Sequence, residues 1–265
     1  GFDGWNRAND ALASIEGSED DLVARFPADE ARIRGYRQHF LRTVTEMVSG
    51  TPAVIAELGQ AGVRLGALTN WAADMFALAR PRFGVFTRFG DIVVSGTEGV
   101  VKPDPEIYRL ACERLGIHPG EAVFIDDSPG NVHAAEEFGL HGLHFTSAAQ
   151  LREDLVGLGL LADRVQITEP IFHWTLRSRW DEATASGDFP WSSRDAGYNA
   201  EGFVHCSFAD QVDGTCRRFY GDVPGAELVL LRLDPTPDLP IVVEDGYPHL
   251  FAPLPVDRVT VVQRP

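Results

Sequence analysis

Polar side chains able to hold a phosphoryl group stand at three points of the chain. Thr69 and Asn70 end the apolar run ALTN, Lys102 precedes a helical pattern in VKPDP, and Asp126 and Asp127 follow the run VFI. A hydroxyl and an ammonium can bind phosphoryl oxygens, and paired carboxylates are hard ligands for Mg²⁺. Taken singly, each motif has a structural explanation, since threonine commonly caps a turn and DDSPGN can form an Asx turn. Their joint order favours a crevice for a phosphorylated molecule and a divalent cation.

Lysine is used once: of the 23 basic residues, 22 are arginine and Lys102 is the only lysine. A compact ammonium fills less space than a planar guanidinium. A lone lysine in an arginine-rich chain therefore indicates a place where arginine would not fit. Chance retention of one surface lysine is the alternative.

A second group of chemically capable side chains lies in the last third of the chain. In the strand-like segment IFHWT the period of two places His173 on one face, and in GFVHCS it places His205 and Ser207 together. Glu244 ends the run IVVE, and His249 follows in YPHLFAPL. Three histidines and a glutamate are metal-ligand types, but these spacings match no familiar metal site. A structural role for each histidine is the equal alternative.

The elements that must position the first group alternate between residues 51 and 156. Strands are expected at 63–69, 91–95, 122–126 and 140–146, and helices at 52–61 (with Thr51 as N-cap), 71–80, 105–115, 130–138 and 148–156. Short buried strands alternating with helices predict an α/β fold with a doubly wound parallel sheet. Ligands of such sheets bind beyond the carboxyl ends of the strands, where Thr69 and Asp126 fall. Residues 8–48 have helical spacing and predict a small helical subdomain.

The second group lies on elements of a different kind. After a junction at 157–168, short strands are expected at 171–175, 202–207, 227–233, 241–244 and 257–263, with helical patterns at 177–186 and 209–220. This mixture predicts a small α+β domain.

Composition limits the partners of this protein. The 265 residues hold 39 acidic and 23 basic side chains, for a net charge of −16, so a nucleic-acid partner is not expected. No apolar run reaches the length of a membrane span, and neither a membrane partner nor a signal peptide is expected, which predicts a cytoplasmic protein. Cys112, Cys206 and Cys216 lack CxxC spacing and are expected to be reduced.

Residues 1 to about 156 resemble the haloacid dehalogenase-like (HAD) hydrolases, in the branch that carries a helical cap after the first strand. The resemblance rests on ALTN, KPDP and FIDDSPGNV. It implies that Thr69 binds the phosphoryl group with Asn70 beside it, that Lys102 steadies the nucleophile and the phosphoryl charge, and that Asp127 ligates Mg²⁺ with Asp126 adjacent. The adjacent acids favour phosphatase over dehalogenase chemistry, because dehalogenating relatives use no metal.

The same resemblance assigns substrate choice to cap side chains, here Trp5, Asn6, Arg7, Asn9, Arg37 and His39. It also places the nucleophile on an aspartate of a DxD motif in the first strand. The printed sequence holds no DxD, and Asp3 in GFDGW follows no apolar strand. We therefore expect the chain to be a fragment whose natural form has roughly 10 to 20 further residues upstream, as the usual length of a strand and its flanks suggests. A pseudoenzyme is the competing expectation.

Residues from about 170 to 265 resemble the small domain of unknown function 952. The resemblance rests on IFHWT, WDEA, EGFVHCSFADQV and YPHLFAPL. It implies a fold similar to that of ADP-ribosyltransferases, with an NAD-like ligand for the second group of side chains.

The sequence thus predicts two domains: a HAD-like domain at 1–158, with its cap at 1–48 and a core at 49–158 that lacks its first strand, and a second domain at 168–265. The expected function is Mg²⁺-dependent hydrolysis of a small phosphomonoester through an aspartyl-phosphate, with the nucleophile-bearing segment outside the printed chain. The alternatives are an inactive scaffold whose C-terminal domain binds a nucleotide such as NAD, and a C-terminal domain that itself transfers ADP-ribose.

Overall fold

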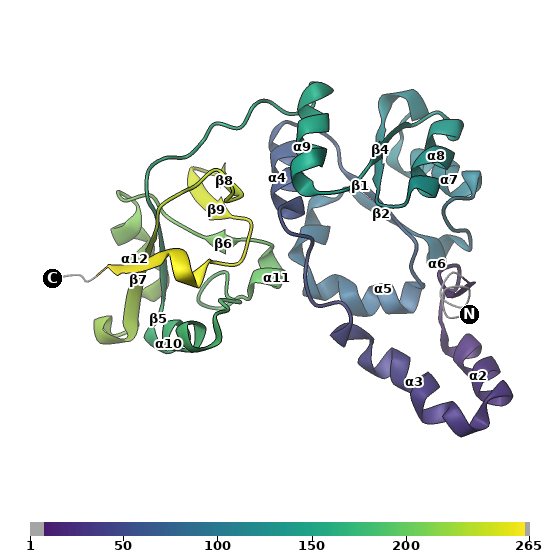
Figure 1. Ribbon diagram of the computed structural model, residues 1–265, viewed down its shortest axis with the longest axis horizontal. Helices are drawn as coiled ribbons and strands as arrows, with labels where there is room; N and C mark the ends of the chain where they lie inside the picture. Colours follow the sequence, from purple (N-terminus) through teal and green to yellow (C-terminus); the bar gives the residue numbers. More distant parts are fainter. Residues whose placement is uncertain (1–7, 263–265) are drawn as a thin grey trace. The chain divides into compact units, whose positions relative to one another are not determined.

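The computed structural model describes residues 8–262, so Asp3, Trp5, Asn6 and Arg7 lie outside the described residues. The described chain divides into two compact units (Figure 1). The first comprises residues up to 46, 62–82 and 86–158, and the second comprises 47–61, 83–85 and the residues from 159 onward. The domain limits at 158 and 168 stay a prediction.

The first unit begins with a helical hairpin. Helices α2 (Glu16–Arg25) and α3 (Glu30–His39) are connected by the short 3-10 turn Pro27–Asp29 and pack against each other. They are drawn in purple in Figure 1. Ile15 and Phe40, at the two ends of the hairpin, are buried against Met75 of the following α/β part. Burial of these side chains fixes the hairpin to that part.

The α/β part of the first unit holds two pairs of parallel strands. Strand β1 (Gly66–Thr69) pairs with β2 (Asp91–Val94), and β3 (Val123–Asp126) pairs with β4 (His141–His144). Within residues 8–262, β1 and β3 are not paired with each other. The single sheet expected from the sequence is therefore present as two parallel pairs in the described part of the chain.

Helices follow these strands, and all of them except the short helix at Ser95–Glu98 were expected from the alternating pattern. They are α5 (Ala73–Ala79), α6 (Ser95–Glu98), α7 (Pro105–Leu115), α8 (Pro129–Phe138) and α9 (Ala148–Gly157). The expected bounds of α7 are confirmed: Asp104 Oδ1 accepts a hydrogen bond from the Glu106 backbone N–H at 2.9 Å, and the helix ends at Gly116 in the left-handed conformation. Ile107 and Tyr108 of α7 pack against Val93 in the core.

The second unit is built on antiparallel sheets. One has the strand order β10 (Val259–Val262), β7 (Leu228–Leu233), β5 (Ile171–Leu176), and the other has the order β6 (Val204–His205), β9 (Tyr247–Leu250), β8 (Ile241–Glu244). Its helices are α4 (Thr51–Gln60), α10 (Arg177–Ser186), α11 (Tyr198–Glu201) and α12 (Val212–Tyr220). The mixed α+β character expected for this part is confirmed; strand β9 was not expected.

Helix α4 belongs to the second unit by its contacts. Ala53 and Ala56 of α4 pack on Val242 and Phe251, and the Gln60 amide donates to the Val243 carbonyl at 2.8 Å. The expected helix is present, but its N-cap is Gly50 and not Thr51, because Thr51 already has helical geometry. No helix within residues 8–262 is long and apolar enough to cross a membrane.

Further short stretches of 3-10 helix connect these elements, at Phe40–Arg42, Arg80–Arg82, Gly84–Arg88, Pro119–Glu121, Gly225–Glu227 and Val256–Arg258.

Candidate active site

A buried ion pair joins the carboxyl ends of two strands in the first unit. Lys102 Nζ lies 2.7 Å from Asp126 Oδ2 at the end of β3, and it also donates to the Leu68 carbonyl of β1 at 2.9 Å. Lys102 and Asp126 are only 8% and 9% exposed. The ammonium therefore links β1 to β3 although the two strands share no backbone hydrogen bonds.

The Asp126 carboxylate is held by donors on both oxygens. Oδ1 accepts from the Ser128 backbone N–H and from the Asn131 side chain, each at 2.9 Å. Burial by itself raises the pKa of Asp126, but the hydrogen bond and charge of Lys102, together with the hydrogen bonds from Asn131 and Ser128, outweigh it, so the pKa lies below its usual range. Asp126 is thus an ionised anchor for Lys102 at neutral pH.

Asn70 is placed beside Lys102 and uses its amide to hold the lysine backbone. Its Nδ2 donates to the Lys102 carbonyl at 2.9 Å, and its Oδ1 accepts from the Lys102 N–H at 2.8 Å. Thr69 ends β1 next to it and is half-buried. The structure therefore brings Thr69, Asn70, Lys102 and Asp126 to one place.

Asp127, unlike the buried Asp126, is exposed to solvent. Its backbone carbonyl lies 3.0 Å from His144 Nε2. In the part of the chain that the structure describes, no three His, Cys, Asp or Glu side chains form a group that could hold a metal ion. Because Mg²⁺ prefers several oxygen ligands and Asp126 already serves Lys102, the described residues alone do not fit a complete magnesium site.

A small cavity adjoins Asn70. It has a volume of about 200 Å³ and is lined by cap residues Asn9, Asp10 and Tyr36 and by Trp71. Asn9 is 4% exposed, and neither atom of its amide has a hydrogen-bond partner among the described residues. The sequence pointed to Asn9 but not to Asp10, Tyr36 or Trp71.

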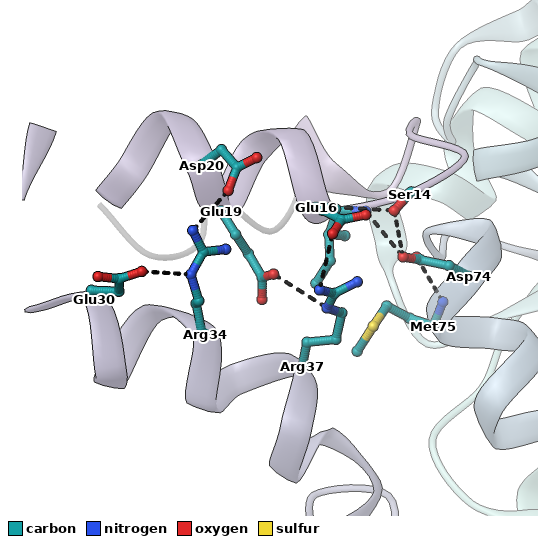
Figure 2. A network of polar contacts seen from close by, with 10 residues as sticks. Ser14, Glu16, Glu19, Asp20, Glu30, Arg34, Arg37, Asp74 and Met75 are labelled. Atoms are coloured by element: carbon teal, nitrogen blue, oxygen red, sulfur yellow. Dashed lines mark hydrogen bonds and ion pairs between the residues drawn. The ribbon is translucent and has the colours of Figure 1, made fainter. Parts of the chain in front are cut away.

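The other described cap candidates do not line this cavity. Arg37 forms ion pairs with Glu19 at 3.3 Å and Glu16 at 3.6 Å, and Figure 2 shows it between helices α2 and α3. His39 is exposed at the end of α3. Arg37 therefore serves the helical hairpin.

The second unit encloses a larger cavity of about 550 Å³. It is lined by all five residues of the second group, His173, His205, Ser207, Glu244 and His249. Sequence reasoning missed further lining residues: Glu201, Arg194, Thr215 and Tyr247. Glu201 and Tyr247 are the first residues of the segments EGFVHCS and YPHL, and this position was the only signal for them in the sequence.

Comparison with protein families agrees with both resemblances. The profile of the haloacid dehalogenase-like hydrolases matches residues 2–139, so this chain belongs to that family, and the profile of a protein family of unknown function, DUF952, matches residues 174–262.

Among curated relatives, the chain is 47% identical over 62 residues to the chloroplastic flavin mononucleotide hydrolase 1 of Arabidopsis thaliana, covering 23% of this chain and 25% of that protein. It is 30% identical over 127 residues to the phosphoserine phosphatase of Thermus thermophilus, covering 45% of this chain and 51% of that protein. The chain thus spans between a quarter and half of the length of these relatives.

Among solved structures, it is similar to a HAD family enzyme of Bacteroides thetaiotaomicron in complex with magnesium and inorganic phosphate. That match has 27% identity and a TM-score of 0.33, and it covers 36% of this chain and 51% of the other.

Proposed function

We propose that the first unit is part of a Mg²⁺-dependent phosphatase that hydrolyses a small phosphomonoester through an aspartyl-phosphate. The observation that carries the proposal is the Lys102 ammonium, held between Leu68 and Asp126 at the carboxyl ends of β1 and β3. A fixed positive charge at this edge can stabilise the charge of a phosphoryl group during transfer.

Each residue of the site has a role in this proposal. The Thr69 hydroxyl donates to a phosphoryl oxygen, Lys102 neutralises phosphoryl charge, and Asn70 and Asp126 hold Lys102 in place. The nucleophile is an aspartate outside the described residues, whose carboxylate attacks phosphorus while the bond to the substrate alcohol breaks; water then hydrolyses the acyl phosphate. Asp127 would be one ligand of Mg²⁺, which when bound would supply further charge stabilisation.

The test is hydrolysis of para-nitrophenyl phosphate by the natural gene product, with Mg²⁺ or with EDTA. We expect Mg²⁺-dependent turnover that Thr69→Ala lowers by about a hundredfold, as for other donors to a developing anion, and that Lys102→Met abolishes. Arg109→Ala, at an exposed ion pair with Glu106, is the control and should leave turnover unchanged. Folded protein with no Mg²⁺-dependent turnover, or with turnover insensitive to Thr69→Ala, would support the inactive scaffold.

A second candidate function concerns the second unit, which we propose binds a nucleotide such as NAD. The 550 Å³ cavity supports it, since this volume lies within the range of ligand sites and its lining combines aromatic side chains with Arg194 and Arg218. A rise in Tm of the chain with added NAD would be the expected result, and no rise at millimolar NAD would count against it.

A further inference from the structure

Three histidines of the second unit line one cavity, and each has a ring nitrogen engaged by a protein acceptor. His173 Nδ1 lies 2.7 Å from the His205 carbonyl, His205 Nε2 lies 3.2 Å from Glu201 Oε2, and His249 Nδ1 lies 3.1 Å from Glu244 Oε2. A carbonyl or a carboxylate can only accept, so each neutral imidazole must donate through that nitrogen. The other nitrogen of each ring then carries a lone pair.

The imidazoles of His173 and His205 are in the neutral form at neutral pH. Burial lowers the pKa of His173 to about 4. Burial also lowers the pKa of His205, and the neighbouring His249 adds to this effect, while Glu201 opposes it. The lone pairs of His173 and His205 are therefore present at neutral pH.

The rings are held in fixed orientations. Phe203 stacks on His249 with ring centroids 4.2 Å apart and planes 19° apart, and the His205 ring meets His249 edge-on at 5.0 Å. Glu201 is fixed in turn, because its Oε2 also accepts from the Ser192 hydroxyl. The acceptor nitrogens are thus positioned before any ligand binds, which lowers the entropic cost of binding.

A site rich in acceptors is complementary to a ligand rich in donors. Across residues 8–262 no His, Cys, Asp and Glu cluster has the arrangement of a metal site, so a metal ion is not the complement. Four carboxylates and two arginines line the cavity, so the lining as a whole does not select for negative charge, although Arg194 and Arg218 can contact the phosphates of a nucleotide. Hydroxyl groups remain as neutral donors, and the rings of Phe172, Phe219 and Tyr247 in the lining suit a flat base.

We propose that this cavity binds the ribose of a nucleoside, whose two neighbouring hydroxyls donate to Nδ1 of His205 and Nε2 of His249. Glu201 and Glu244 are positioning residues that fix which nitrogen of each ring accepts. The inference deepens the second candidate function but does not require the phosphates of a nucleotide.

The test is the affinity of the full chain for adenosine and for 2′,3′-dideoxyadenosine, which lacks both hydroxyls, measured by calorimetry and by Tm. Adenosine should bind and raise Tm, and the dideoxy compound should bind at least about tenfold more weakly, because two hydrogen bonds are lost. Absence of adenosine binding, or equal affinity for both compounds, would overturn the inference. If NAD binds while adenosine and its dideoxy form have equal affinities, only the nucleotide candidate is upheld. If adenosine binds more tightly than its dideoxy form while NAD does not bind, only the ribose inference is upheld.

Variants locate the effect. His205→Leu should remove most of the preference for adenosine, while far-ultraviolet circular dichroism confirms the fold, since the His205 side chain is 46% exposed. Glu201→Gln should reduce the same preference without abolishing binding of the base, because a glutamine amide can donate and so permits the other tautomer. The matched control is His133→Leu: His133 pairs with Glu137 at 3.5 Å on the exposed surface of α8 and should leave both affinities unchanged. A preference that survives His205→Leu would contradict the assignment.

Discussion

The Asn70 side chain and the Lys102 backbone are joined by two reciprocal hydrogen bonds, one accepted and one donated by the asparagine amide. The backbone of Lys102 is therefore held by the side chain of Asn70, which directly follows strand β1. Asn70 fixes where the ammonium of Lys102 can lie.

Replacing Asn70 should lower the stability of the first unit. Asn70→Ala leaves the N–H and carbonyl of Lys102 without these partners, so we expect a loss of about 1–3 kcal/mol in the free energy of unfolding, measured in urea. Asn70→Asp keeps the acceptor and should lose less. Equal losses in the two variants would show that the reciprocal pair is not what holds Lys102.

The buried pair of Lys102 and Asp126 should be costly to break from one side. Lys102→Met leaves a buried carboxylate without its counter-charge and should cost about 3–5 kcal/mol of unfolding free energy. Adding Asp126→Leu should recover part of that loss, because no unpaired charge then remains. The exposed Arg109→Ala variant should unfold like the parent protein. A double variant no more stable than Lys102→Met would contradict this account.

The pair of Lys102 and Asp126 should also make the free energy of unfolding of the first unit depend on pH in the acid range. The pKa of Asp126 is lower in the folded than in the unfolded state, so its stabilisation is present above the unfolded pKa and is lost as pH falls through the folded pKa. Urea unfolding between pH 7 and pH 2 should therefore show a steeper acid loss for the parent than for the double variant. Parallel curves would refute the linkage.

Glu19 should give the stability of the protein the opposite dependence on pH. Its side chain is fully buried between α2 and α3, where Arg37 Nε lies 3.3 Å from Glu19 Oε2 (Figure 2). Neither carboxylate oxygen makes a hydrogen bond to a described residue. Burial raises its pKa, with Arg37 opposing, so stability from this group is present at low pH and lost as pH rises through the folded pKa.

The measurement is the Tm of Glu19→Gln relative to the parent at pH 4 and pH 7. The variant should gain on the parent by about 2–4 °C as pH rises, the size expected for about 1 kcal/mol. Glu30→Gln, at an exposed position of α3, is the control and should show no such trend. A gain that is larger at pH 4 would have the wrong sign.

Gly96 should not tolerate a side chain. A Cβ at this position would lie 2.4 Å from the Ala73 nitrogen and 2.4 Å from the Leu12 carbonyl oxygen, both backbone atoms. Gly96→Ala should therefore cost about 1–3 kcal/mol or more of unfolding free energy. Gly59→Ala in α4 meets no atom within 4 Å and should instead stabilise by about 0.5–1 kcal/mol. Equal effects at the two glycines would disprove the steric argument.

Adenosine binding should weaken in acid if His205 accepts a ribose hydroxyl. The charged and titratable groups around its ring are Glu201, Glu244 and His249. Because burial holds the pKa of His205 below its ordinary value, affinity should be constant from pH 8 to about pH 6.5, where a free histidine is already half-protonated, and should fall at lower pH. Affinity that rises in acid would mean that a protonated ring donates to the ligand.

The sequence by itself determined most helices and strands of this protein, though not β9, and the class of the first unit. Local signals sufficed for helix α7, where Asp104 caps the start and Gly116 ends it, and short continuous apolar runs sufficed for β3 and β8. The polar residues at the strand ends could be assigned to one binding site, because the carboxyl ends of parallel strands meet at one edge of the sheet. Lys102 stood out from composition alone.

Only the tertiary structure decided the partners of these residues. Asn70 was expected beside Thr69, and the structure shows that its amide holds the Lys102 backbone, 32 residues away. Glu201 beside His205 and Tyr247 in strand β9 were not foreseen, because contacts across sheets depend on register and packing. Side-chain partners brought together from distant segments leave no periodic signal in the sequence, whereas helices and strands do.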